Sequence, residues 1–311
     1  MEHTQTPLLE VSDLSVSFRM YGSGLEQRQL PVISSLSLRV LPGEILAVAG
    51  SSGSGKSLLA SAILGILPGN ATVSGALQFD GEPLTPERQA RLRGTEIALV
   101  PQSVAFLDPL MKVGAQADGH RKPRPTEARR ALFRQLGLPE KTERLYPFQL
   151  SGGMARRVLV STALLSEARL IIADEPTPGM SLEQAEEALS MFRAMADAGK
   201  GVVLITHDID LAFHIADRIA VFYAGTTVET APAADFRRGP EALRHPYSQA
   251  LWRALPQHGF QPITGFQPYA GSLPQGCLFA PRCPHRTAEC EQAVPPMETV
   301  RSGEVRCYHA T

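Results

Sequence analysis

The 311-residue sequence has no long apolar run and no signal-peptide pattern at its start. A membrane-spanning helix needs about 20 apolar residues. The best candidate, Leu58 to Leu67, is shorter and is interrupted by serine and glycine. The first seven residues lack the basic region and apolar core of a signal peptide. We therefore expect a chain without a membrane span that is made and kept in the cytosol.

The sequence also has no large excess of positive or negative charge. The 30 lysines and arginines balance 31 aspartates and glutamates, which gives a net charge of −1. Nucleic-acid-binding chains usually carry a basic excess, so no nucleic-acid partner is expected. The hydrophobic fraction of 43% is sufficient for a sizeable core, and the length corresponds to about two domains.

The order of apolar patterns predicts an α/β fold. Residues 8–18 and 32–40 alternate as half-buried strands, whereas residues 44–49 are mostly apolar, as in a strand buried on both faces. Further strands and helices then alternate, which is typical of a parallel sheet with helical crossovers. Prolines, aromatics and all four cysteines gather after about residue 236. We expect a main domain over residues 1–235 and a small module over 236–311.

One glycine-rich segment fits the pattern G-x-x-x-x-G-K-[ST] completely. It consists of Gly50, Ser51, Ser52, Gly53, Ser54, Gly55, Lys56 and Ser57. It lies between a predicted buried strand and a predicted helix, which is the context that a phosphate-binding loop requires. The backbone N–H groups and the helix N-terminus would face a pyrophosphate. We expect Lys56 to reach the β- and γ-phosphates, Ser57 to ligate Mg²⁺, and Leu58 to offer its backbone N–H. An ordinary glycine-rich turn is the alternative.

Two apolar strands end in polar residues. Asp174 and Glu175 follow one strand, and His207 follows another. The carboxyl ends of parallel strands face the ligand crevice. We expect Asp174 to hold Mg²⁺, directly or through water, and Glu175 to polarise the attacking water. His207 should point at the same crevice. The alternatives are a helix-capping Asp-Glu pair and a packed or surface histidine.

Two more segments complete a family pattern. Gln102 follows a short apolar strand and can offer its carbonyl to Mg²⁺ or water. Leu150-Ser151-Gly152-Gly153-Met154 lies upstream of the Asp-Glu strand. With these segments the chain resembles ABC ATPases over about residues 8–235, with five motifs in family order.

The resemblance implies a P-loop NTPase (RecA-like) core, an antiparallel β subdomain and a helical signature subdomain at about residues 103–168. It also implies that the chain binds and hydrolyses ATP with Mg²⁺. The aromatic residue that stacks on adenine in this family maps to Phe18 or, less well, to Tyr21. Phe18 is alternatively a core residue of its alternating strand.

The signature segment implies a second subunit. Ser151, Gly152 and Gly153 precede a helix expected from Met154 onward, and a helix N-terminus binds phosphate well. In the family this segment contacts the ATP held by the other subunit. Most relatives carry an aspartate in the loop after Asp-Glu-Pro-Thr, and here Ser181 stands in its place. We therefore expect an asymmetric heterodimer with a second ABC ATPase subunit.

The tail resembles that of ATPases from oligopeptide, dipeptide and nickel importers. The similar segments are His245-Pro246-Tyr247-Ser248-Gln249-Ala250-Leu251 and Gly276-Cys277-Leu278-Phe279-Ala280-Pro281-Arg282-Cys283-Pro284. This implies a peripheral subunit at the cytoplasmic face of the membrane that powers import of peptides, nickel or a metal chelate. Its partners would be two permease subunits and an extracytoplasmic substrate-binding protein. A soluble ABC ATPase acting in DNA repair or on ribosomes is the alternative, and a nucleotide-gated regulatory protein is a third.

The four cysteines favour metal ligation over disulfides in a cytosolic chain. They are Cys277, Cys283, Cys290 and Cys307, and their spacing lacks the paired C-x₂-C of common zinc sites. The resemblance suggests a [4Fe-4S] cluster, with Zn²⁺ or four unmetallated thiols as alternatives. Separately, the basic run from His120 through Arg121 and Lys122 to Arg124 is read as a solvated loop, or else as a contact with lipid or permease.

Overall fold

The structure is a computed structural model that describes residues 6–21, 26–51, 53–119 and 126–310. Ser52 of the phosphate loop and the basic run at His120 to Arg124 lie outside the described residues. Within the described residues, no helix is long and apolar enough to cross a membrane.

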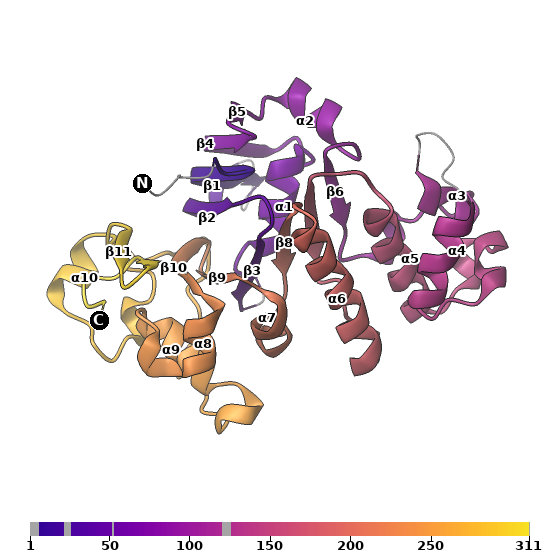
Figure 1. Cartoon of the computed structure of the whole chain (residues 1–311). Coiled ribbons are helices and arrows are strands. Elements are labelled where there is room, and N and C mark those ends of the chain that lie inside the picture. The colour runs from indigo at the N-terminus through magenta and orange to yellow at the C-terminus, as the bar shows by residue number, and fades with distance from the viewer. Residues whose placement is uncertain (1–5, 22–25, 52, 120–125, 311) are drawn as a thin grey trace.

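The N-terminal strands form an antiparallel sheet in the order β2-β1-β4-β5 (Figure 1). Its members are β1 (Leu9–Tyr21), β2 (Gln27–Val40), β4 (Ala71–Phe79) and β5 (Glu82–Pro83). β1 and β2 show the alternating burial that the sequence predicts. A short helix that the sequence analysis missed follows, α2 (Pro86–Leu92). Thr85 caps it and Pro86 takes its first position, which suits proline because no N–H is needed there.

The central sheet has eight strands in the order β11-β12-β10-β9-β3-β8-β7-β6. Five of them are parallel: β3 (Ile45–Gly50), β6 (Ile97–Val100), β7 (Leu170–Asp174), β8 (Gly201–Ile205) and β9 (Arg218–Tyr223). β3, β7 and β8 are buried along their whole length. This confirms an α/β fold with a parallel sheet.

The parallel strands separate two hydrophobic layers. Side chains of successive strand residues point to opposite faces. Leu46 and Val48 therefore pack with the antiparallel sheet and α1 (Lys56–Leu64), whereas Ala47 and Ala49 pack with the opposite layer. That second layer contains α5 (Gly152–Leu164), α6 (Leu182–Asp197) and α7 (Ile209–Ile215).

A helical region lies beyond β6, at one side of the molecule (Figure 1). It contains α3 (Val113–Asp118) and α4 (Thr126–Gln135), which both pack on α5. α5 begins at Gly152, two residues earlier than the expected start at Met154. The hydroxyl of Ser151 caps it, so the helix includes both glycines of the signature segment.

The C-terminal module extends the central sheet. Its helices and strands are α9 (Pro246–Arg253), α10 (Ala288–Gln292), β11 (Glu298–Val300) and β12 (Gly303–Val305). β10 (Thr226–Pro232) precedes it in the main domain, and α8 (Ala233–Arg238) spans the boundary. β12 pairs with β10, and β10 pairs with β9. The module is therefore joined to the core by sheet hydrogen bonds across the boundary that composition suggests.

Candidate functional site

The phosphate loop runs from the end of β3 to the start of α1. A side chain at Gly50 would place its Cβ 2.4 Å from the carbonyl oxygen of Phe222, so only glycine is accommodated there. Gly55, with φ of 95°, is the N-cap of α1. Glycine tolerates this left-handed conformation without a Cβ clash. These features let the loop turn sharply beneath a cavity of about 290 Å³.

Lys56 lies at this cavity and is held by the loop itself. Its ammonium donates hydrogen bonds to the carbonyl oxygens of Gly50, at 2.8 Å, and Ser51, at 2.9 Å. Burial lowers the pKa of Lys56, and the nearby carboxylates of Glu175 and Asp174 oppose that effect. A buried ammonium of this kind is suited to an anionic phosphate. The cavity is lined by Val32, Gly53, Gly55, Lys56, Ser57, Leu58, Gln102 and Glu175.

Asp174, the last residue of β7, is buried beside the loop. Burial raises the pKa of its carboxyl group, and a hydrogen bond with Ser57 opposes this rise. Its Oδ1 is buried without a hydrogen-bond partner among the described residues. Carboxylate and hydroxyl oxygens are ligands that Mg²⁺ prefers. The donor set of Asp174 and Ser57 therefore fits this ion.

Glu175 connects two of the other predicted residues. One carboxylate oxygen accepts a hydrogen bond from the amide of Gln102 at 3.1 Å, and the other lies 3.2 Å from Nδ1 of His207. The backbone of Glu175 is left-handed, with φ of 47°, which is a strained conformation for a residue other than glycine. Its N–H donates to the carbonyl of Ile205 at the end of β8. The structure thus brings the three side chains together.

Arg156 is a member of this region that the sequence analysis missed. It is buried on α5 and donates hydrogen bonds to the carbonyl oxygens of Pro101, at 2.8 Å, and Gln102. Burial lowers the pKa of its guanidinium, against the attraction of Glu175 and Asp174. Arg156 thereby links the signature helix to the Gln102 segment. The signal in the sequence was a pair of arginines, Arg156 and Arg157, within an otherwise largely apolar helix.

The signature residues lie apart from the phosphate cavity of their own chain. The residues lining that cavity include none of Ser151, Gly152 and Gly153. Ser151 and Gly152 are exposed. A Cβ on Gly153 would lie 2.8 Å from the carbonyl oxygen of Gly179, so the signature approaches the loop before Ser181 closely.

Phe18 lies on β1 between Leu30 and Ala71 of the neighbouring strands. It is partly buried and packs against the hydrophobic layer of the antiparallel sheet. It is not among the residues that line the phosphate cavity. Tyr21 is 66% exposed and receives a hydrogen bond from Gln27 at 3.4 Å.

The four cysteines are free thiols in the C-terminal module. Burial raises the pKa of Cys277 and Cys283, and it raises the pKa of Cys307 to about 11. Burial thus disfavours the thiolate form of these three side chains. Among the described residues, no group of three or more His, Cys, Asp or Glu side chains is arranged to hold a metal ion.

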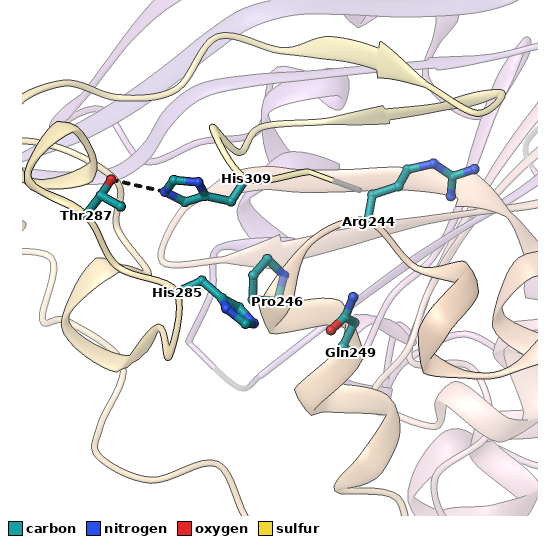
Figure 2. A pocket seen from close by; sticks show the side chains of 6 residues that line it. All are labelled: Arg244, Pro246, Gln249, His285, Thr287 and His309. Atoms are coloured by element: carbon teal, nitrogen blue, oxygen red, sulfur yellow. Dashed lines mark hydrogen bonds between the residues drawn. The ribbon is translucent and has the colours of Figure 1, made fainter.

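A cavity of about 360 Å³ lies beside the stretch between Cys283 and Cys290, which contributes His285 and Thr287 to its lining (Figure 2). It is lined by Arg244, Pro246, Gln249, His285, Thr287 and His309. The Thr287 hydroxyl lies 3.0 Å from Nε2 of His309, and the sulfur of Cys290 lies 3.5 Å from the same nitrogen. The Arg244 guanidinium is already paired with Glu229 and Asp235. Its charge is therefore neutralised within the protein.

The fold and the phosphate site define an ATP-binding cassette ATPase. A family model described as ABC transporter matches residues 33–178, and one described as the C-terminal region of oligopeptide/dipeptide transporters matches residues 228–290. A dimeric ATP-binding cassette bound to ADP and phosphate has the same fold, with a TM-score of 0.64 and 24% identity. That likeness covers 72% of this chain and 98% of the other. An ATP-binding subunit of an ABC transporter has a TM-score of 0.60 and 27% identity, covering 74% and 92%.

Relatives that match over nearly their whole length define the family of this chain more narrowly. The dipeptide transport ATP-binding protein DppD of Haemophilus influenzae is 35% identical over 97% of this chain and 95% of its own. The oligopeptide transport ATP-binding protein OppD of Salmonella typhimurium is 34% identical over 98% and 96%. The chain therefore belongs to the ATP-binding proteins of the oligopeptide/dipeptide ABC transporter family.

Family membership fixes the general activity. The chain binds and hydrolyses ATP as a subunit of a membrane ABC importer, with permease and substrate-binding partners. It acts as a peripheral protein at the cytoplasmic face of the membrane. These comparisons support the importer interpretation and not the soluble alternative.

Proposed function

We propose that this site hydrolyses ATP with Glu175 as the residue that polarises the attacking water. The observation that carries the proposal is the position of the Glu175 carboxylate, which lines the same cavity as Lys56 and Ser57. Gln102 and His207 hold that carboxylate from two sides. Lys56 and the loop N–H groups bind the phosphates, and Leu58 adds its backbone N–H.

Ser57, Asp174 and Gln102 would hold Mg²⁺, which neutralises phosphate charge when it is bound. Gln102 uses its amide N–H toward Glu175, so its carbonyl oxygen is not engaged in that bond. The unpartnered oxygen of Asp174 supports its part in this set. Phe18 or Tyr21 would stack on adenine. Ser151, Gly152 and Gly153 would contact the ATP of a partner subunit.

The variant Glu175→Gln tests the proposed base. An amide of the same shape cannot accept a proton, so ATP hydrolysis should fall by about 10²- to 10⁴-fold while ATP binding remains. Phosphate release and nucleotide binding should both be measured on the purified complex. Glu183→Gln, an exposed change in the first turn of α6, is the matched control. Unchanged hydrolysis in Glu175→Gln would contradict the assignment.

We further propose that the transported solute is a dipeptide or oligopeptide. Two relatives that match nearly the whole chain are named for dipeptides and oligopeptides, and the C-terminal match carries the same description. These descriptions favour peptides over nickel or a metal chelate, which the resemblance of the C-terminal segments also implied. The proposed complex contains this chain, a second ABC ATPase, two permease subunits and an extracytoplasmic binding protein.

Affinity purification from detergent-solubilised native membranes tests the composition. Mass spectrometry should recover a second ATPase and two permeases with the tagged chain. The complex in proteoliposomes, supplied with its binding protein, should then hydrolyse ATP faster with short peptides than with Ni²⁺. A complex with two copies of this chain would contradict the heterodimer, and stimulation by Ni²⁺ alone would contradict the peptide.

The metal content of the cysteine module stays a prediction. Four thiols in one small module support a [4Fe-4S] cluster or, alternatively, Zn²⁺. The described residues do not place three ligands at one point, so the sulfurs would have to move closer on loading. Anaerobic purification followed by metal and sulfide analysis tests this. Iron with an equal amount of acid-labile sulfide would support the cluster, zinc would support the alternative, and neither would contradict both.

A further inference from the structure

The C-terminal module reaches back to the phosphate loop. The hydroxyl of Ser51 donates a hydrogen bond of 2.5 Å to Oε1 of Gln267, which lies 216 residues further along the chain. Tyr247 of α9 lies near the same serine: burial raises the pKa of its phenol, and its interaction with the side chain and backbone of Ser51 opposes this rise. Gln267 therefore holds Ser51 by a hydrogen bond, and Tyr247 lies within reach of the same residue.

Ser51 in turn holds Lys56. Its carbonyl oxygen accepts a hydrogen bond from the ammonium at 2.9 Å, and the only other backbone carbonyl to do so among the described residues is that of Gly50. The loop contains Gly53 and Gly55, both with positive φ, so its own backbone resists distortion weakly. The position of the ammonium thus depends on contacts made by Ser51 outside the loop.

Tyr247 is itself held rigidly. It is 2% exposed, and its ring centroid lies 4.5 Å from that of Tyr223 and 5.4 Å from that of Phe279. Arg282 donates a hydrogen bond to the Tyr223 hydroxyl at 3.3 Å. Phe279 and Arg282 belong to the segment that contains Cys277 and Cys283. The packed contacts therefore run without a break from the cysteine segment to the phosphate loop.

We propose that Gln267 and Tyr247 are positioning residues for ATP binding. Acting through Ser51, they keep the Lys56 ammonium where it receives the phosphates, so the C-terminal module sets the affinity of the site for nucleotide. The inference rests on the proposed role of Lys56. Neither residue is among those that line the cavity with Glu175, so their effect should fall on nucleotide binding rather than on the hydrolytic step.

The test uses the full-length chain in its purified complex. Gln267→Ala should raise the KM and the Kd for ATP by about 2- to 10-fold, the effect of losing one hydrogen bond. Tyr247→Phe, which removes only the phenol hydroxyl, should raise both constants in the same direction. The kcat should change less than 2-fold. Gln261→Ala, an exposed glutamine of the same module, is the control and should leave both constants unchanged. The melting temperature without nucleotide should stay close to that of the wild type for the Gln267 and Gln261 variants.

A double-mutant cycle with Ser51→Ala separates positioning from general destabilisation. If Gln267 acts through Ser51, Gln267→Ala should add no further increase in Kd in the Ser51→Ala background. The proposal would be overturned if Gln267→Ala raised the Kd equally in the wild-type and Ser51→Ala backgrounds. It would also be overturned if Gln267→Ala and Tyr247→Phe both left the Kd unchanged. Lys56→Ala reports on the proposed function separately: undiminished ATP binding in that variant would overturn the role of Lys56 itself.

Discussion

His245 shows how burial controls a single ionisable residue. It is 1% exposed at the start of α9, where its Nδ1 accepts a hydrogen bond from the N–H of Tyr247 at 2.9 Å. A protonated nitrogen cannot accept this bond. Burial lowers the pKa of His245 to about 3. The ring is therefore neutral in the folded protein over the whole physiological range.

We predict that His245 makes stability depend on pH. The unfolded chain binds a proton at this residue below about pH 6.5, whereas the folded chain does so only near pH 3. The contribution of His245 to the free energy of unfolding is complete above pH 6.5 and is lost progressively as the pH falls from 6.5 to 3. The slope is about 1.4 kcal/mol per pH unit, which gives about 2 kcal/mol at pH 5. Denaturant unfolding at pH 7.5 and 5 measures the loss.

The matched variant is His245→Asn, because asparagine can cap a helix but does not titrate in this range. The difference in unfolding free energy between pH 7.5 and 5 should be smaller in this variant by about 2 kcal/mol. Equal losses in the two proteins would assign the pH dependence to other groups.

The structure brings some of the predicted site residues together and adds one that the sequence did not indicate. The structure brings Lys56, Ser57 and Asp174 to one place because each follows or ends a strand of the same sheet. Arg156 was missed because its function depends on carbonyl oxygens 54 and 55 residues away, which no local pattern reveals. Gln267 was missed for the same reason.

At the scale of elements, Ser181 stands in the loop before α6 at the position where the family resemblance implies an aspartate. Ser181 is the N-cap of α6: its hydroxyl accepts a hydrogen bond from the N–H of Gln184, and the Gln184 side chain accepts from the Ser181 N–H. Serine and aspartate cap helices about equally well. The helix therefore keeps its cap although the aspartate is absent, and what is lost is a negative charge.

We predict separate effects for two changes at this position. Ser181→Ala should lower the unfolding free energy by about 1 kcal/mol because the cap is lost. Ser181→Asp should retain stability and restore the charge. If the missing aspartate causes asymmetry, Ser181→Asp should make nucleotide turnover at the two sites of the complex more equal. Equal nucleotide turnover at both sites of the wild-type complex would contradict the hypothesis of an asymmetric heterodimer.

Elements were predictable where one pattern dominated. The buried strands β3, β7 and β8 were recognised because residues buried on both faces are continuously apolar. α2 was missed because only Gln89 and Leu92 of its seven residues are buried, so it has little apolar periodicity. The start of α5 was placed late because glycine is a poor helix former, whereas the Ser151 cap stabilises the first turn.

At the scale of the whole molecule, Arg244 joins the C-terminal module to the core. It is 1% exposed and forms ion pairs with Glu229 of β10, at 3.3 Å, and Asp235 of α8, at 2.8 Å. It also donates a hydrogen bond to the carbonyl oxygen of Val300 in β11 at 2.6 Å. One guanidinium thereby connects β10 and α8, which follow one another in the chain, with β11, whose Val300 lies 56 residues beyond Arg244.

Arg244→Met should destabilise the protein strongly. The change leaves the buried carboxylate of Glu229 without its cation and Asp235 with only the exposed Arg238, and breaking a buried ion pair costs about 3–5 kcal/mol. Arg253→Met is the control, since that side chain is 41% exposed and its pair with Glu241 spans 3.7 Å. The control should lose less than about 1 kcal/mol. Chemical denaturation of both variants provides the measurement, and similar losses would refute the structural role of Arg244.

The local chemistry of this protein follows from the order of its residues. The phosphate loop, the carboxylates at strand ends and the capped signature helix are each encoded within a few neighbouring residues. The pairing of β12 with β10 and the contact of Gln267 with Ser51 arise only in the folded chain. Such contacts join residues far apart in the chain, and their energy depends on packing and burial that appear only when the sheet has assembled.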